Sequence, residues 1–503
     1  MNVEQVIKQL ESIVKPERIL TDPEDLYVYS FGKIFQRQNP VPNMVVRAIS
    51  PKETQEVMEL SRRAGLTIEE RGETSSLLNR TEPVILLDNI ATPELKESLE
   101  EKEEAIEILE EIRKRGYGTP RNSALALKAL LLKKTFAENK ECDSYKGYCT
   151  VASSFDGIET WSSKGRVVIV RGLQNGELEI SKKIVDVLYT CTECGLCFAR
   201  CSEDLKVHEA ILATRRYIAE KGLIPKVFDE TAKNIKETGD PGAAPVKHRL
   251  SWTKNLPIQT PPKKAKTLYW VGCMVADRTP ETAKAFFNIM NHANVEFTML
   301  MKREGCCGYI LLSTGLWDEA EKNAEKVLSG IEETRAETLV TSCAGCYYAF
   351  KKLYPKILGM SLPCKVLHST HFIEDLIKNG RLDLKKLDAR VTYHDPCSLG
   401  RHGEVYDAPR NVLEALPGLT FAEMELNRQR SRCGGGGGGL WSFNHKISME
   451  SAYLRLNDLQ PLNVDMLTTA CPLCQMNFRY ASSRKSLPVR VCDITEIVES
   501  ALS

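Results

Sequence analysis

The second half of this 503-residue chain contains one pattern twice. Each copy begins with a strand-like run that enters a cysteine loop, written "KTLYWVGCM" and "ARVTYHDPCSLG". A second strand-like run ends in C-x-x-C, "ETLVTSCAGCYYAF" and "DMLTTACPLCQMNF", and each copy closes with a strand and a helix, "CKVLHSTHFIEDLI" and "VRVCDITEIVESAL". Strands that alternate with helices predict a parallel sheet. We therefore expect two repeated parallel α/β units, over residues 262–380 and 388–503.

The rest of the chain is expected to form three further parts. The sequence pattern of residues 1–92 predicts a small α/β unit, in which Ser50 caps a helix and Pro51 occupies the first position of that helix. Residues 93–134 predict a charged helical linker, and residues 135–250 a mainly helical module that holds the first six cysteines. The fold class predicted from these parts is multidomain α/β.

Cysteine is the residue type that narrows the function most. The chain has 17 cysteines, and none precedes Cys142. The net charge of +1 gives no reason to expect nucleic acid as a partner. No apolar run reaches the length of a membrane span, and the N-terminus lacks the apolar centre of a signal peptide, so we expect a cytoplasmic protein, with peripheral membrane association only through a partner. In that reducing compartment, clustered cysteines indicate metal or redox chemistry.

The stretch "YTCTECGLCFARCSEDL" has the C-x2-C-x2-C-x3-C spacing of bacterial ferredoxins. In two-cluster ferredoxins the fourth cysteine of each run binds the other cluster, so a partner run is expected upstream. We interpret "NKECDSYKGYC" as an eroded partner run that keeps Cys142 and Cys149. The prediction is one cubane [4Fe–4S] cluster, with Cys201 as a further candidate ligand or a buried remnant. The expected ligands are Cys149, Cys191, Cys194 and Cys197.

The two repeat units carry different cysteine sets. Adjacent cysteines cannot both point at one iron without strain, but they can hold neighbouring irons of a larger cluster. The first unit contains such a pair, and its five cysteines are Cys273, Cys306, Cys307, Cys343 and Cys346. The second unit has four, which suit a cubane, a smaller iron–sulfur cluster or zinc. These are Cys397, Cys433, Cys471 and Cys474. Six glycines follow Cys433 and predict backbone packed closely against a metal site.

These motifs resemble those of the cysteine-rich CCG domains of heterodisulfide reductases and of the iron–sulfur subunits of glycolate oxidase and glycerol-3-phosphate dehydrogenase. The order of a ferredoxin-like module and two such domains is similar, as is "SSKGRVVIVRGL". The resemblance implies a noncubane [4Fe–4S] cluster at the five cysteines, the site at which the family cleaves a disulfide. The second unit departs from the pattern, because alignment on the paired cysteines places Arg432 at the first of the two.

The N-terminal segment is similar to the start of the flavin-binding domain of glycolate oxidase-like enzymes, through "VVRAISPKETQEVMELSRRAG" and "ERGETSS". In that family a glycine-rich loop holds the flavin pyrophosphate. The corresponding loop at residues 72–76 contains a single glycine and the acidic Glu73. We therefore expect a truncated unit that does not bind FAD.

Together these features predict an iron–sulfur oxidoreductase subunit of heterodisulfide reductase type. Electrons are expected to enter at the cubane from a flavoprotein partner and pass to the five-cysteine cluster, which would reduce a disulfide. One alternative is a pure electron-transfer subunit of a flavin-dependent 2-hydroxy acid or glycerol-3-phosphate dehydrogenase. Another is a scaffold whose second CCG domain binds zinc.

Overall fold

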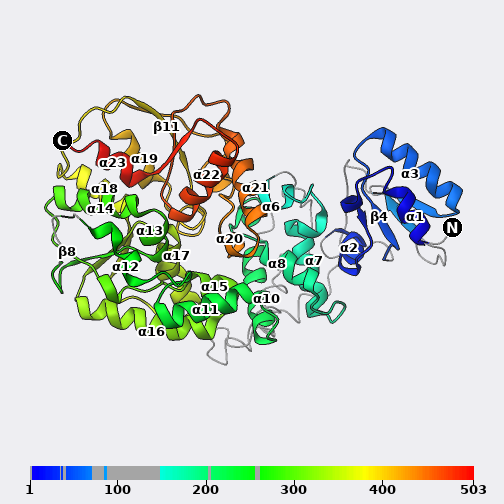
Figure 1. Ribbon diagram of the computed structural model, residues 1–503, viewed down its shortest axis with the longest axis horizontal. Helices are drawn as coiled ribbons and strands as arrows, with labels where there is room; N and C mark the ends of the chain where they lie inside the picture. Colours follow the sequence, from blue (N-terminus) through cyan, green and yellow to red (C-terminus); the bar gives the residue numbers. More distant parts are fainter. Residues whose placement is uncertain are drawn as a thin grey trace.

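The computed structural model describes residues 3–33, 36–37, 41–70, 84–87, 148–201, 206–254, 256 and 261–503. The predicted linker at 93–134, the loop at 72–76 and Cys142 lie outside these residues. Figure 1 shows three regions along the long axis: a small α/β unit at the N-terminal end, a helical region in the middle, and the two repeat units at the other end.

The N-terminal unit is a four-stranded sheet in the order β1-β4-β6-β5, in which only β1 runs antiparallel to its neighbour. The strands are β1 (Ile19–Leu20), β4 (Met44–Val46), β5 (Thr67–Glu70) and β6 (Val84–Leu87). Helices α1 (Val3–Leu10) and α3 (Pro51–Ala64) pack together, and α3 begins as predicted, because the Ser50 hydroxyl accepts the Glu53 N–H. Helix α2 (Pro23–Tyr29) joins this unit to the helical region, where its buried Asp25 contacts Thr160 and Lys183.

The helical region carries the ferredoxin-like cysteines between short helices. Its helices are α6 (Thr150–Ser153), α7 (Ser163–Gln174), α8 (Lys182–Tyr189), α9 (Leu196–Ala199), α10 (Val207–Glu220), α11 (Lys226–Thr238) and α12 (Val246–Arg249). Helix α7 is buried along most of its length and packs against α10, while α15 (Tyr309–Thr314) of the first repeat also packs against α10. This region shares one hydrophobic core with both repeat units.

Each repeat unit is built on a fully parallel four-stranded sheet. The first sheet has the order β10-β9-β7-β8 and the second β12-β11-β13-β14. When the strands are numbered within each repeat and the first sheet is read from β8, both orders are 2-1-3-4, so the topology is the same. The strands are β7 (Thr267–Trp270), β8 (Phe297–Thr298), β9 (Thr338–Thr341), β10 (Lys365–His368), β11 (Ala389–His394), β12 (Leu419–Phe421), β13 (Met466–Thr469) and β14 (Arg490–Asp493). The prediction of parallel α/β units is confirmed.

The two repeats pack through reciprocal helix pairs. In the first, α14 (Pro280–His292) follows the first strand and α18 (Ser369–Lys378) follows the last; α19 (Asp407–Glu414) and α23 (Ile494–Ser500) are their equivalents in the second. Helix α14 packs against α23, and α18 packs against α19. Each repeat therefore offers the same pair of helices to the other, as in an interface between two copies related by a two-fold axis.

Candidate metal centres

The five thiols of the first repeat gather at the carboxyl ends of its central strands. Cys273 begins α13 (Cys273–Arg278) just after β7, and Cys343 follows β9, beside which β7 pairs. From β7 the chain continues to β8 at one edge of the sheet, and from β9 it continues to β10 at the other edge. Such a switch point leaves a crevice outside the carboxyl ends of the two strands. The C-x-x-C pair of Cys343 and Cys346 opens α17 (Ala344–Tyr348), so both thiols lie at this crevice.

The adjacent cysteines of the first repeat form a hydrogen bond with each other, and each also has a further thiol partner. The Sγ atoms of Cys306 and Cys273 are 3.8 Å apart, and the Cys307 thiol forms a hydrogen bond with that of Cys346. Their carbonyls are held from outside, because Asn323 donates to Cys306 O at 2.9 Å and the Tyr354 hydroxyl donates to Cys307 O at 2.8 Å. Cys306 and Cys307 therefore connect Cys273 and Cys346 within one group of thiols. The hydrogen bond with Cys306, and then burial, raise the pKa of the Cys273 thiol well above its ordinary value.

A buried carboxylate fixes the loop that carries Cys273. Glu304 accepts the N–H groups of Val271 at 3.1 Å and Gly272 at 2.7 Å. Burial raises the pKa of Glu304 to about 7, against the opposing effect of these two hydrogen bonds. Sequence reasoning missed Glu304. It lies just before the paired cysteines in the sequence, and only folding brings its side chain to the loop that follows β7.

The four thiols of the second repeat also come together. The Cys433 thiol forms a hydrogen bond with that of Cys397, and the Cys471 thiol forms one with that of Cys474. Cys474 is near all three others: its bond with Cys471, burial, and the charges of Cys471, Cys397 and Cys433 raise its thiol pKa well above the ordinary value. The two C-x-x-C motifs therefore occupy equivalent places, since Cys471 follows β13 and precedes α22 (Pro472–Arg484) as Cys343 precedes α17.

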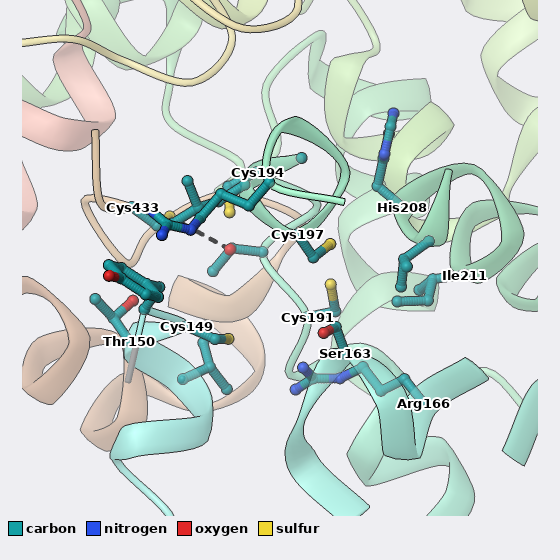
Figure 2. A pocket seen from close by; sticks show the side chains of 17 residues that line it. Cys149, Thr150, Ser163, Arg166, Cys191, Cys194, Cys197, His208, Ile211 and Cys433 are labelled. Carbon is teal, nitrogen blue, oxygen red and sulfur yellow. Dashed lines mark hydrogen bonds between the residues drawn. The ribbon is translucent and has the colours of Figure 1, made fainter. Parts of the chain in front are cut away.

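Five cysteines surround a cavity in the helical region, and Figure 2 shows Cys149 and Cys433 on segments separate from the loop of Cys191, Cys194 and Cys197. Cys149, Cys191, Cys194 and Cys197 line it together with Cys433. Burial, followed by the charges of Cys194, Cys191 and Cys149, raises the pKa of the Cys197 thiol well above its ordinary value. Cys201, which the structure also describes, does not line this cavity.

The ferredoxin-like thiols adjoin those of the second repeat. The Cys194 thiol forms a hydrogen bond with that of Cys433, and the Cys433 Sγ lies 3.3 Å from the Thr192 hydroxyl. The described contacts between the helical region and the first repeat do not join thiols of the two parts. One example is the Tyr189 hydroxyl, which donates to Thr314 O at 2.9 Å. The cavity therefore lies next to the second repeat rather than the first.

The glycine run fills the space between these two thiol groups. A Cβ atom at Gly434 would lie 3.0 Å from the Cys474 Sγ, and one at Gly437 would lie 2.9 Å from Thr192 O. At Gly438, whose φ of +58° already favours glycine, a Cβ would lie 2.5 Å from Cys191 O. The close backbone packing predicted for this run is present.

Replacing Gly438 with alanine should therefore cost more than replacing a glycine of the same conformation in open space. Gly380 is such a control, because its φ is +62° and nothing lies within 4 Å of its Cβ position. Both variants carry the backbone strain, but only G438A presses on the Cys191–Thr192 backbone, so it should lower the free energy of unfolding by a further ~1–3 kcal/mol. Urea unfolding of both variants measures the difference, and equal midpoints would contradict this account.

Two residues soon after Cys397 reach the ferredoxin-like loop, and sequence reasoning missed both. Arg401 donates from Nε to Cys194 O at 2.7 Å and from Nη1 to Ser431 O at 2.6 Å. Burial opposes its charge, but the thiols of Cys194, Cys397 and Cys433 outweigh burial and raise the Arg401 pKa. His402 Nε2 lies 2.8 Å from Glu193 O, and burial lowers the pKa of the ring to about 3, so it is neutral.

Arg432, expected from alignment to mark an altered ligand position, forms an ion pair instead. Its Nη1 lies 2.9 Å from Asp458 Oδ1, and Arg455 holds the other oxygen of the same carboxylate at 2.7 Å. The side chain is thus directed toward Asp458.

Arg215 joins the helical region to both repeats. It is fully buried in α10, and Nη1 donates at 2.8 Å to each of Glu193 Oε1, Ser313 O and Gly438 O. Nη2 donates at 2.7 Å to Leu188 O and Cys191 O. One guanidinium therefore fixes the start of the ferredoxin-like loop, the first repeat and the glycine run of the second.

The donors present fit iron–sulfur clusters. Each of the three groups is a set of buried or half-buried thiols, and cysteine thiolates are the usual ligands of such clusters. Within the described ranges, no three or more His, Cys, Asp or Glu side chains are arranged to hold a single metal ion. Among those same residues, every helix is too short or too polar to serve as a membrane span.

Comparison with known proteins identifies the family. The cysteine-rich domain family matches residues 267–351 and 391–479, one in each repeat. A protein of the CoB–CoM heterodisulfide reductase of Methanosarcina acetivorans is 34% identical over 337 residues, which are 66% of this chain and 81% of the relative. An iron–sulfur protein of Methanococcus maripaludis is 31% identical over 60% of this chain and 59% of its own length. A component of the CoM/CoB fumarate reductase of Methanothermobacter marburgensis is 32% identical over 63% of this chain and 62% of its own length. Two matched cysteine-rich domains and this similarity over most of a reductase component place the chain in the heterodisulfide reductase iron–sulfur family.

Proposed function

We propose that this chain is an iron–sulfur reductase subunit that holds three clusters. Cys149, Cys191, Cys194 and Cys197 hold a cubane [4Fe–4S] cluster, the five thiols of the first repeat hold a noncubane [4Fe–4S] cluster, and the four thiols of the second repeat hold a third. Bound clusters of this kind supply one-electron transfer. The observation that carries the proposal is the convergence of 13 cysteines, from segments far apart in the sequence, into three neighbouring groups.

The placement of the three thiol groups supports an order of electron transfer, from the ferredoxin-like group to the second repeat and then to the first. The ferredoxin-like thiols contact the second repeat through Cys194 and Cys433, so these two groups form one adjoining pair. None of the five thiols of the first repeat lines the cavity, and the ring of Tyr309 lies between these thiols and those of the second repeat. Its hydroxyl bonds with Ser398, beside Cys397, and its Cδ1 lies 3.6 Å from a Cβ placed at Gly345, between Cys343 and Cys346. This differs from the route expected from sequence, which led from the cubane directly to the first repeat.

The chain's own residues contribute to the proposed sites in distinct ways. Arg401 brings a fixed positive charge between the ferredoxin-like thiols and those of the second repeat, and Glu304 orders the loop of Cys273. Cys273 is the most exposed thiol in the first group, because the other four are buried. A disulfide or related acceptor is therefore proposed to meet the first repeat from the side of Cys273. A flavoprotein or another redox subunit is the proposed electron donor.

Metal and sulfide analysis of anaerobically purified protein, combined with electron paramagnetic resonance, tests the proposal. We expect iron and acid-labile sulfide in about equal amounts, about four irons for each [4Fe–4S] cluster, and signals from at least two kinds of centre. Zinc in place of iron in all three groups, or no metal at all, would refute it. Reduction of a disulfide by the loaded protein would favour the reductase over a subunit that only transfers electrons to a partner.

A further inference from the structure

The second repeat has lost a cysteine, and the structure locates the loss at a different residue from the one that sequence alignment indicates. Alignment on the paired cysteines puts Cys433 opposite Cys307 and Arg432 opposite Cys306. The backbone gives another register. Gly308 N–H donates to Cys306 Sγ at 3.4 Å, and Gly435 N–H donates to Cys433 Sγ at 3.3 Å. These two glycines have similar φ values, +77° and +84°.

The partners of the thiols agree with this register. The Cys306 thiol forms a hydrogen bond with Cys273, which follows the first strand of its repeat. The Cys433 thiol forms one with Cys397, which follows the first strand of the second repeat. Cys433 is therefore the equivalent of Cys306, and Gly434 takes the place of Cys307.

Gly434 also faces the residue that a fifth thiol would contact. The Cys307 thiol forms a hydrogen bond with Cys346, the second cysteine of the first C-x-x-C motif. A Cβ at Gly434 would lie 3.0 Å from the Sγ of Cys474, the second cysteine of the other motif. The carbonyls match as well. Tyr354 donates to Cys307 O at 2.8 Å, and Asn477 donates to Gly434 O at 2.7 Å. Both donors come from the helical segment that follows C-x-x-C.

We propose that the second repeat is a five-thiol site reduced to four by glycine at position 434, and that it takes a cluster with four thiolate ligands. This inference rests on the proposed function. The missing ligand corresponds to Cys307, which forms the adjacent pair of the first repeat together with Cys306. The two repeats therefore hold different kinds of cluster. Arg432 lies one position before the pair, and its side chain is directed to Asp458.

Adding a cysteine at each of the two candidate positions separates the two registers. In G434C the new thiol reaches Cys474 as Cys307 reaches Cys346, so the paramagnetic resonance signal of the second group should change to resemble that of the first. R432C should leave both signals as they are. G434A supplies the Cβ without the thiol and should keep the signal of the second group, with tighter packing against Cys474 and Phe478. Iron content is measured for all three variants.

The reciprocal variant C307G gives a second readout, in which the signal of the first group should come to resemble that of the second. A changed signal in R432C with none in G434C would overturn the inference, as would a C307G protein whose first-group signal is unchanged. If G434A alone loses iron, crowding by the added Cβ explains that loss. The signal of the first group in C307G then decides between the two registers. A wild-type protein without iron would instead refute the proposed function, so the two failures are distinguishable.

Discussion

Replacing Arg215 with methionine should lower the free energy of unfolding by about 3–5 kcal/mol, the usual cost of removing one partner of a buried ion pair. The methionine fills a similar volume but leaves Glu193 buried without its cation. It also leaves the carbonyls of Leu188, Cys191, Ser313 and Gly438 without this donor. Burial already raises the pKa of Glu193 to about 7, so protonation of this carboxyl offsets part of the cost.

The neighbouring arginine provides a matched control. Arg216 forms ion pairs with Glu220 and with Asp318, whose side chain is 64% exposed. Pairs of this kind contribute about 0–1 kcal/mol, so R216M should change the urea midpoint little. Both variants are measured under anaerobic conditions by circular dichroism. An R215M protein as stable as R216M would show that Arg215 does not hold the three regions together.

The repeat could be predicted from sequence because its signals are local. An apolar run before Cys273 and another before Cys397 predict strands, and the C-x-x-C motifs at Cys343 and Cys471 recur at nearly the same distance. Both sheets form as expected. The reciprocal packing of α14 on α23 and of α18 on α19 had no such local signal, since it depends on which helix faces are left uncovered by each sheet.

The cysteine groups were predictable in part for the same reason. Spacing alone indicates that Cys191, Cys194 and Cys197 act together, but the contact between Cys194 and Cys433 joins residues 239 positions apart and has no pattern in the sequence. Arg215, Arg401 and Glu304 bond mainly with backbone groups, and these bonds leave no mark on the residue types of their partners.

The register of the second repeat shows how adjacency in sequence can mislead. In "RCGGGGGG", aligning the single cysteine with either member of a pair requires one mismatch, so the letters do not decide between Arg432 and Gly434. The backbone does, because the N–H of the residue two positions after the cysteine must donate to its sulfur, and a glycine with positive φ must occupy that position. Only the assignment of Gly435 to Gly308 meets both conditions.

The variant C197A should lose the proposed cubane while both repeats keep their proposed clusters. Cys197 is the thiol whose neighbours include all three of the other proposed ligands, and three thiolates are too few for an ordinary cubane. We expect the iron content to fall by about four atoms per chain. The cubane signal in electron paramagnetic resonance should disappear, and the signals assigned to the repeats should remain.

C201A is the control for C197A, because both cysteines are half-buried and lie in the same ferredoxin-like run. Cys201 does not line the cavity among the described residues, so its removal should leave both the iron content and the cubane signal unchanged. Loss of the cubane in C201A, with retention in C197A, would assign the fourth ligand to Cys201 and contradict the proposed set. Loss in both variants would make the whole run of four cysteines necessary. Since Cys149 is the ligand that comes from outside this run, C149A should behave as C197A does, and it tests whether the upstream segment completes the site.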